Sequence, residues 1–331
     1  HIMHHVLEPL DARIPQWDLN HLSARHCPFC NMENETVLKR PDKLPVAFCN
    51  SCGSWYVTKL PCVSEIKKMY DGYYYEHRPT DLSEKNVSQM IENARASSQT
   101  DWQLQALAAT LGGLKGKRIL DVGCGIGRFL LSARFKGADV VGCDLSSEAC
   151  EFANNRLEIT VYQSDLSSCI SSVGDVDAVV MRDFIEHPIS PLIDIQTAVG
   201  ILKPGGLCLF HTPNGGLAGR SLDTASKWVG FRVDLEHLQY LSPHTINWLS
   251  RTLDLSIERL DAFGFPGLKG IDELPKLKKR ARTTRLAKDI LKSIPYMRTI
   301  VKAIRAVKTE INGGHCDPRL GAYHLFAILR K

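Results

Sequence analysis

The chain has 331 residues, of which 44% are hydrophobic and 23% charged, with a mean hydropathy of −0.14 and a formal net charge of +5. These proportions exclude a mainly disordered or collagen-like chain, and no apolar run reaches the roughly 18–20 residues that a membrane-spanning helix needs. Residues 1–5 lack an apolar signal segment and indicate a cloning remnant before a start at Met3. We therefore expect a cytoplasmic protein of about two domains whose cysteines are reduced or bind metal.

Four of the eleven cysteines form two closely spaced pairs near the start of the chain. Cys27 and Cys30 are separated by two residues, as are Cys49 and Cys52, and eighteen residues lie between the pairs. Each pair could supply two thiolates from one tight turn, and two such turns complete a four-sulfur shell of the structural zinc type. Disulfides are disfavoured in the cytosol, and a redox Cys-x-x-Cys motif would explain one pair but not two. We expect a zinc ribbon whose Zn²⁺ folds the module without catalysing a reaction.

A strand, a glycine-rich turn, a helix and a second strand are predicted from residue 117 onward. The apolar residues Ile119, Leu120 and Val122 lead into a turn with three alternating glycines, Gly123, Gly125 and Gly127. A helical pattern follows, and the next apolar run, 138–143, ends in Asp144. This order begins a doubly wound parallel sheet. The glycines allow a ligand to approach the backbone, and the acid at the second strand end can accept hydrogen bonds from ribose hydroxyls.

The spacing of the turn distinguishes between nucleotide-binding families. A dinucleotide fingerprint requires glycine at position 128, which is Arg128, and no Gly-Lys-Ser/Thr of a phosphate-binding loop follows. With Asp121 before the three glycines, the segment resembles motif I of class I S-adenosylmethionine-dependent methyltransferases. The resemblance covers residues 100–262 and 317–331. It implies an α/β fold with a Rossmann-like, doubly wound seven-stranded sheet whose last strand is antiparallel.

The resemblance also implies where the cofactor and the acceptor bind. Residues 161–165 match the end of the third strand, whose acid faces the adenine amine, and residues 177–187 match the fourth strand with its following Glu-His. The implied S-adenosylmethionine-binding residues are Asp121, Gly123, Gly125, Gly127, Asp144, Leu145, Asp165, Leu166 and Arg182. Glu236 and His237 resemble a late motif in which a His precedes a helix that starts after Ser-Pro.

The front of the chain carries a second resemblance. This part resembles the N-terminal part of UbiG-like, type 11 or type 23 methyltransferases of sugar, surface-glycan and natural-product pathways. It combines a zinc ribbon, a helical stretch and a tyrosine cluster that could cover the cofactor (Tyr70, Tyr73 and Tyr74). The expected units are a zinc ribbon (1–60), a helical connector and cofactor cover (61–114), the methyltransferase domain (115–262), a basic amphipathic helical insertion (263–315) and the final strand of the methyltransferase domain (316–331).

Three residues are candidates for catalysis. The protein must hold the acceptor in line with a methyl group that is already activated, and a hydroxyl acceptor also needs a base. A histidine suits that role near neutral pH. His237, beside Glu236, and His187 lie on loops at strand ends, where ligands gather in open α/β sheets, although either could instead order its loop. His211, inside the fifth strand, is predicted to be an interior residue.

The late basic segment is the source of the positive net charge. Residues 266–311 hold thirteen Lys or Arg and four Asp or Glu, a balance of +9, so the remaining residues sum to −4. Apolar residues recur at helical spacing there: Leu286, Ile290, Ile294, Met297, Val301 and Ile304. The segment predicts a lid on the acceptor site or, through residues 276–311, a peripheral membrane or lipid-linked acceptor contact.

These observations together predict an S-adenosylmethionine-dependent methyltransferase for a small molecule. We expect in-line SN2 transfer to a sugar, glycan or natural-product hydroxyl, with deprotonation assisted by a histidine. An RNA methyltransferase that grips phosphates with the ribbon and the basic segment is one alternative, but no aromatic side chains interleave the basic run 276–282 as stacking platforms would. A non-catalytic cofactor-binding module is the other alternative. The acceptor and the oligomeric state are not indicated.

Overall fold

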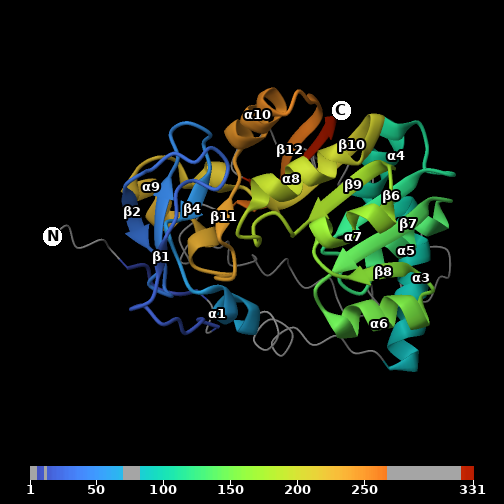
Figure 1. Cartoon of the computed structure of the whole chain (residues 1–331), viewed down its shortest axis with the longest axis horizontal. Coiled ribbons are helices and arrows are strands. Elements are labelled where there is room, and N and C mark those ends of the chain that lie inside the picture. Colours follow the sequence, from blue (N-terminus) through green and yellow to red (C-terminus); the bar gives the residue numbers. More distant parts are fainter. Residues whose placement is uncertain (1–5, 11–12, 70–82, 267–321) are drawn as a thin grey trace, which may run out of the picture.

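A seven-stranded sheet forms the centre of the computed structural model, which describes residues 6–10, 13–69, 83–266 and 322–331 (Figure 1). Its strands, in spatial order, are β12 (Ser256–Pro266), β13 (Ala322–Arg330), β10 (Leu202–Pro213), β9 (Val176–Arg182), β6 (Arg118–Val122), β7 (Asp139–Asp144) and β8 (Thr160–Gln163). The pairs from β10 to β8 are parallel, and β13 runs antiparallel to both of its neighbours. The predicted α/β fold with an antiparallel last strand is therefore confirmed.

The strands are apolar on both faces because helices cover both sides of the sheet. In β9, Val179 and Met181 belong to one buried cluster, and Ala178 and Val180 belong to another. This alternation is the period of two that a strand imposes, and β-branched residues such as these valines are favoured in strands. The sheet is therefore the middle layer of three.

The two outer layers are helical. The cluster that contains Val179 includes residues of α7 (Leu166–Val173), α8 (Pro191–Gly200) and α10 (Pro243–Thr252). The cluster on the opposite face includes residues of α3 (Glu84–Thr100), α4 (Trp102–Leu111), α5 (Arg128–Phe135) and α6 (Ser147–Arg156). Among the described helices, none combines the length and hydropathy needed to cross a bilayer.

One predicted boundary differs from the strand that forms there. β12 continues to Pro266, beyond the boundary expected at residue 262, because it remains paired with β13 up to Ala322. Residues 263–266 are therefore strand and not part of the helical insertion. The tyrosines at positions 70, 73 and 74 and the basic segment 276–311 lie outside the described residues. In the connector, the described residues include α1 (Val63–Lys68), α3 and α4.

The N-terminal module is a small antiparallel sheet completed by a strand from much later in the chain. Its order is β11 (Gln239–Tyr240), β4 (Trp55–Val57), β3 (Pro45–Phe48) and β2 (Thr36–Lys39), and a separate pair joins β1 (Ser23–Ala24) to β5 (Lys59–Leu60). Gln239 pairs with Tyr56 and Tyr240 with Trp55. Figure 1 shows the orange β11 beside the blue strands of this module. The module is therefore joined to the later part of the chain by backbone hydrogen bonds.

A shared aromatic core strengthens that junction. The ring of Trp55 lies 5.1 Å from that of Phe231, in the short helix η3 (Val229–Phe231), and Trp228 lies 4.7 Å from Phe231 and 5.0 Å from Tyr240. The short helices η2 (Gly215–Ala218) and α9 (Leu222–Lys227) contribute Leu217 and Ala225 to the same cluster. All four rings are essentially buried, and edge-to-face pairs of this kind add stability beyond area burial.

Candidate active site

The glycine turn between β6 and α5 has the geometry expected of a ligand cradle. Gly123 has φ of +70°, and a Cβ there would lie 2.8 Å from Phe184 Cδ2, so only glycine fits this close approach. Gly125 has φ of +51°, and no heavy atom lies within 4 Å of where its Cβ would be. The backbone at Gly125 therefore faces open space at the carboxyl edge of the parallel strands, where ligands of such sheets bind.

Asp144, the last residue of β7, is tied to this turn. Its carboxylate accepts hydrogen bonds from the backbone N–H of Gly125 at 2.7 Å and of Ser146 at 2.9 Å. The next residue, Leu145, has an exposed fraction of 70%. An acid beside an exposed apolar side chain suits a nucleoside, because ribose hydroxyls can bond to the acid and the base can lie on the apolar surface.

Asp121 near the end of β6 is buried. Burial raises the pKa of its carboxyl group to about 7, with further increases from the charges of Asp144 and Asp183, and the charge of Arg182 opposes this change. Asp121 therefore changes its charge near neutral pH. A cationic ligand at this edge would favour the ionised form.

The other residues implied for the cofactor lie at the same edge. Asp165 caps α7, and its side chain accepts a hydrogen bond from Ser168 N–H at 2.8 Å. The side chain of Leu166 is buried in the core, so only its backbone could face a ligand. The Arg182 guanidinium lies 4.9 Å from the Phe129 ring centroid. The ends of β6, β7, β8 and β9 thus bring all the predicted cofactor residues to one edge.

The two candidate catalytic histidines meet on neighbouring loops. The rings of His187 and His237 lie 4.8 Å apart at an interplanar angle of 68°. His237 Nε2 is 4.0 Å from Glu186 Oε1. Burial, with the charges of Asp183 and Glu236 in addition, raises the pKa of Glu186 well above its usual range. The site therefore places two imidazoles beside a carboxyl group that is reluctant to ionise.

The same group of side chains could hold a divalent cation. One ligand atom from each of Glu186, His187 and His237 lies within 4.8 Å of the others. Glu236, the third predicted catalytic residue, is buried next to His237 in the chain, with 5% of its surface exposed. Proton transfer and metal binding are thus both compatible with this arrangement.

Further polar residues lie on β10 and β13 beside Asp183, and of these only His211 was considered from the sequence. His211 Nδ1 of β10 lies 3.4 Å from Asp183 Oδ1, and His211 Nε2 lies 3.3 Å from His324 Nδ1 of β13. Burial lowers the pKa of His211 to about 3 and also lowers that of His324. His211 is an interior residue, as predicted. The sequence signal for His324 is a polar residue in a strand that is otherwise apolar or aromatic up to Leu329.

The four cysteines of the N-terminal module converge on one point. Their sulfur atoms all lie within 4.8 Å of one another, with Cys27 and Cys52 separated by 3.4 Å and Cys30 and Cys49 by 3.3 Å. Tetrahedral zinc with Zn–S bonds of about 2.3 Å needs sulfur separations of about 3.8 Å, within this range. All described cysteines are free thiols. The donor set therefore fits the predicted zinc ion.

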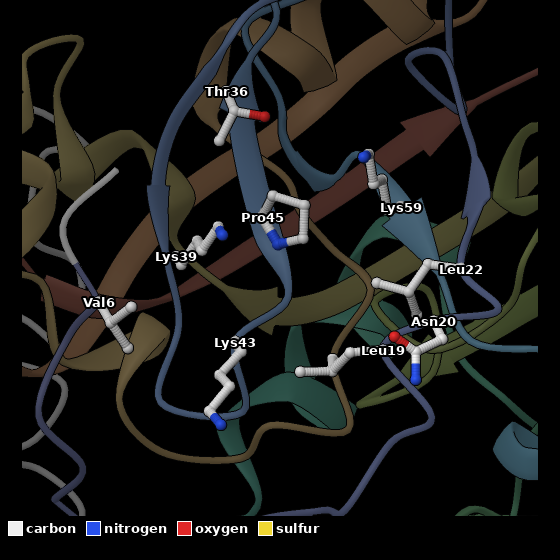
Figure 2. Close-up of a pocket in the computed structure, with 9 residues that line it drawn as sticks. All are labelled: Val6, Leu19, Asn20, Leu22, Thr36, Lys39, Lys43, Pro45 and Lys59. Atoms are coloured by element: carbon white, nitrogen blue, oxygen red, sulfur yellow. The ribbon is translucent and has the colours of Figure 1, made fainter. Parts of the chain in front are cut away.

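A separate hollow of about 490 Å³ lies on the N-terminal module (Figure 2). It is lined by Val6, Leu19, Asn20, Leu22, Thr36, Lys39, Lys43, Pro45 and Lys59. None of these residues belongs to the predicted cofactor or catalytic set. The hollow is thus distinct from the edge of the large sheet.

A comparison with protein families matches residues 94–260, about half of the chain, to the family described as "Methyltransferase domain". The chain belongs to this methyltransferase family. The matched range includes the glycine turn and both histidine loops. The prediction of a class I S-adenosylmethionine-dependent methyltransferase domain is therefore confirmed, and the sugar or natural-product subgroup stays a prediction.

Relatives of this methyltransferase domain include two ubiquinone biosynthesis O-methyltransferases. The protein from Alkalilimnicola ehrlichii is 35% identical over 118 residues, which are 34% of this chain and 48% of the relative. The protein from Vibrio parahaemolyticus is 37% identical over 108 residues, 31% of this chain and 46% of the relative. The matches thus span about half the length of these curated relatives.

Solved structures of low sequence identity are also similar to the chain. A SAM-dependent methyltransferase from Archaeoglobus fulgidus is 18% identical, with a TM-score of 0.46 and coverage of 79% of this chain and 99% of that chain. The plantazolicin methyltransferase BamL, solved with a desmethyl analogue and SAH, is 16% identical, with a TM-score of 0.43 and coverage of 81% and 90%.

Proposed function

We propose that the chain transfers a methyl group from S-adenosylmethionine to a hydroxyl of a small molecule of the sugar, glycan or natural-product type. The observation that carries the proposal is the His187–His237 pair, which lies at the same edge of the sheet as the glycine turn. The relatives' name, O-methyltransferase, supports an oxygen acceptor. The cysteine cluster is proposed to hold a structural Zn²⁺.

The glycine turn and the acids around it are proposed to hold the cofactor. The open space over Gly125 leaves room for the ligand, and Asp144 offers an acceptor to ribose. When bound, S-adenosylmethionine supplies a methyl group activated by its positively charged sulfur. Holding the acceptor in line with that group can supply about 7–11 kcal/mol of the barrier.

His237 is proposed to be the base for the acceptor hydroxyl. Its imidazole takes the hydroxyl proton as the oxygen–carbon bond forms and the carbon–sulfur bond breaks, with the electron pair of that bond remaining on sulfur. The imidazolium so formed would lie 4.0 Å from Glu186 Oε1, where its positive charge would favour the ionised form of that carboxyl group. A placed base contributes about 10²- to 10⁴-fold to such a reaction.

The test is formation of S-adenosylhomocysteine by the whole chain with a panel of acceptors that includes sugars, nucleotide sugars, phenols, lipid-linked sugars and RNA. We expect His237→Gln to lower kcat at least a hundredfold and to leave the Kd of the cofactor within about threefold. His21→Gln is the matched control, because His21 is exposed on the N-terminal module and its ring bonds to Asp18. Full activity of His237→Gln would overturn the assignment of the base.

The two alternative functions correspond to other outcomes of this assay. Product formed only with RNA would favour an RNA methyltransferase. Tight cofactor binding without product from any acceptor would favour a non-catalytic binding module. We retain residues 276–311 as a proposed lid or lipid contact, and product formed only with lipid-linked acceptors would favour the lipid contact.

A further inference from the structure

Arg40, just after β2 of the N-terminal module, is fully buried, and each of its five N–H donors has a partner. Two donors bind Asp42, with Nε 3.2 Å from Oδ1 and Nη2 2.6 Å from Oδ2. This contact has the fork geometry that arginine forms with a carboxylate. The Asp42 carboxylate thus holds the guanidinium plane in one orientation.

The other three donors cross to the loop that carries His237. Arg40 Nη2 donates to the Leu235 carbonyl oxygen at 2.7 Å, and Nη1 donates to the Tyr240 hydroxyl at 2.9 Å and to the carbonyl oxygen of His237 itself. The backbone of the proposed base is therefore hydrogen-bonded directly to the N-terminal module. Lysine could not reproduce this, because it offers one point charge with three donors and no planar fork.

A second arginine of the module reaches the loop that carries His187. Arg25 donates to the Ile189 carbonyl oxygen at 3.3 Å and to the Leu238 carbonyl oxygen at 3.0 Å. It also donates to Gln239 Oε1 at 2.9 Å. Gln239 in turn donates from Nε2 to the carbonyl oxygens of Ile185 at 2.8 Å and Pro188 at 2.9 Å. One connected network therefore spans both histidine loops.

We propose that Arg40 and Arg25 are positioning residues that set the relative placement of the His187 and His237 rings, so that the N-terminal module forms part of the catalytic unit. The inference rests on the proposed function for its effect on turnover. The placement of the rings can be measured without turnover. The two arginines touch loop backbone and Gln239, and neither is proposed to contact substrate or cofactor.

The experiment compares Arg40→Lys and Arg25→Gln in the full chain with Arg220→Lys as the matched control. The Arg220 guanidinium lies 5.4 Å from the centroid of the Phe48 ring of the module, and among the described residues it makes no hydrogen bond or ion pair with the histidine loops. The first readout is the set of imidazole ¹H–¹³C NMR signals at constant pH, assigned with His187→Gln and His237→Gln. We expect both signals to shift or broaden in the two test variants and to remain unchanged in the control.

The second readout is whether each variant changes kcat, KM or both. We expect each test variant to lower kcat at least tenfold and to leave the KM and Kd of S-adenosylmethionine within about twofold, because the cofactor edge is not touched. Folded test variants with both wild-type imidazole signals and wild-type kcat would overturn the proposal. If Arg40→Lys does not fold, the result for Arg25→Gln decides the positioning role, because this substitution leaves the buried Arg40–Asp42 ion pair in place. If the wild type has no activity, the proposed function fails and the NMR result still decides the positioning role.

Discussion

From the raised pKa of Asp121 we predict that the affinity for the cofactor increases with pH. Burial raises its pKa from 3.8 to about 7. Since one pH unit corresponds to about 1.4 kcal/mol, ionising this carboxyl in the folded protein costs about 4 kcal/mol more than in water. S-adenosylmethionine carries a net positive charge, so its binding should favour ionised Asp121. Affinity should therefore rise about tenfold per pH unit below pH 7 and level off above it.

The assay is calorimetric titration of the whole chain with S-adenosylmethionine between pH 5.5 and 8.5. Asp121→Asn should show a flat profile, and the difference between the two proteins cancels the ionisation of the ligand itself. An identical pH profile in wild type and Asp121→Asn would refute the reasoning.

The same carboxyl also affects the free energy of unfolding. Between pH 4 and pH 7 the unfolded chain has lost the Asp121 proton and the folded chain retains it, so the stability of the ligand-free protein should fall as pH rises. The fall should be about 1.4 kcal/mol per pH unit relative to Asp121→Asn. Urea unfolding of both proteins at each pH measures it, and a parallel pH dependence would contradict the raised pKa.

Three further predictions concern other parts of the molecule. Cys52→Ser should unfold the N-terminal module and lose one zinc ion per chain, as measured by elemental analysis. Cys62 is exposed, so Cys62→Ser should keep both the metal and the stability of the protein. An unchanged zinc content in Cys52→Ser would contradict the site. Because burial lowers the pKa of His211 to about 3, wild type should lose about 1.4 kcal/mol of stability per pH unit below pH 6.5 relative to His211→Asn, as followed by urea unfolding. Gly125→Ala and Gly112→Ala should each lower the free energy of unfolding by about 1–2 kcal/mol, because both glycines have a positive φ, which is +74° at Gly112. Only Gly125→Ala should weaken cofactor binding, at least tenfold as measured by calorimetry. Equal cofactor affinity in the two alanine variants would contradict the cradle.

Local patterns in the sequence predict the parts of the fold and of the candidate site that depend on residues close together in the chain. The two Cys-x-x-Cys turns converge as their spacing requires, and the glycine turn leads from β6 into α5. The antiparallel final strand also forms where the resemblance placed it. Each of these features is encoded within about twenty residues or by a resemblance to known sequences.

Features that depend on distant partners were not predictable in this way. Arg40 is a charged residue in a polar turn, and its burial follows from acceptors nearly two hundred residues later. His324 lies near His211 only because β13 inserts beside β10. β11 has two residues, Gln239 and Tyr240, too few for any hydrophobic periodicity. Such contacts depend on the tertiary fold and leave no local signal.

The late arrival of β11 has a consequence for biosynthesis. Tyr56 of β4 pairs with Gln239, 183 residues later, so a nascent chain on the ribosome carries the open edge of β4 until most of the sheet has been synthesised. The four cysteines of the proposed zinc site are complete by residue 52, long before that edge is covered. An unpaired strand edge is a template for association, so translation products that stop before residue 239 should be prone to aggregate even when they are loaded with metal.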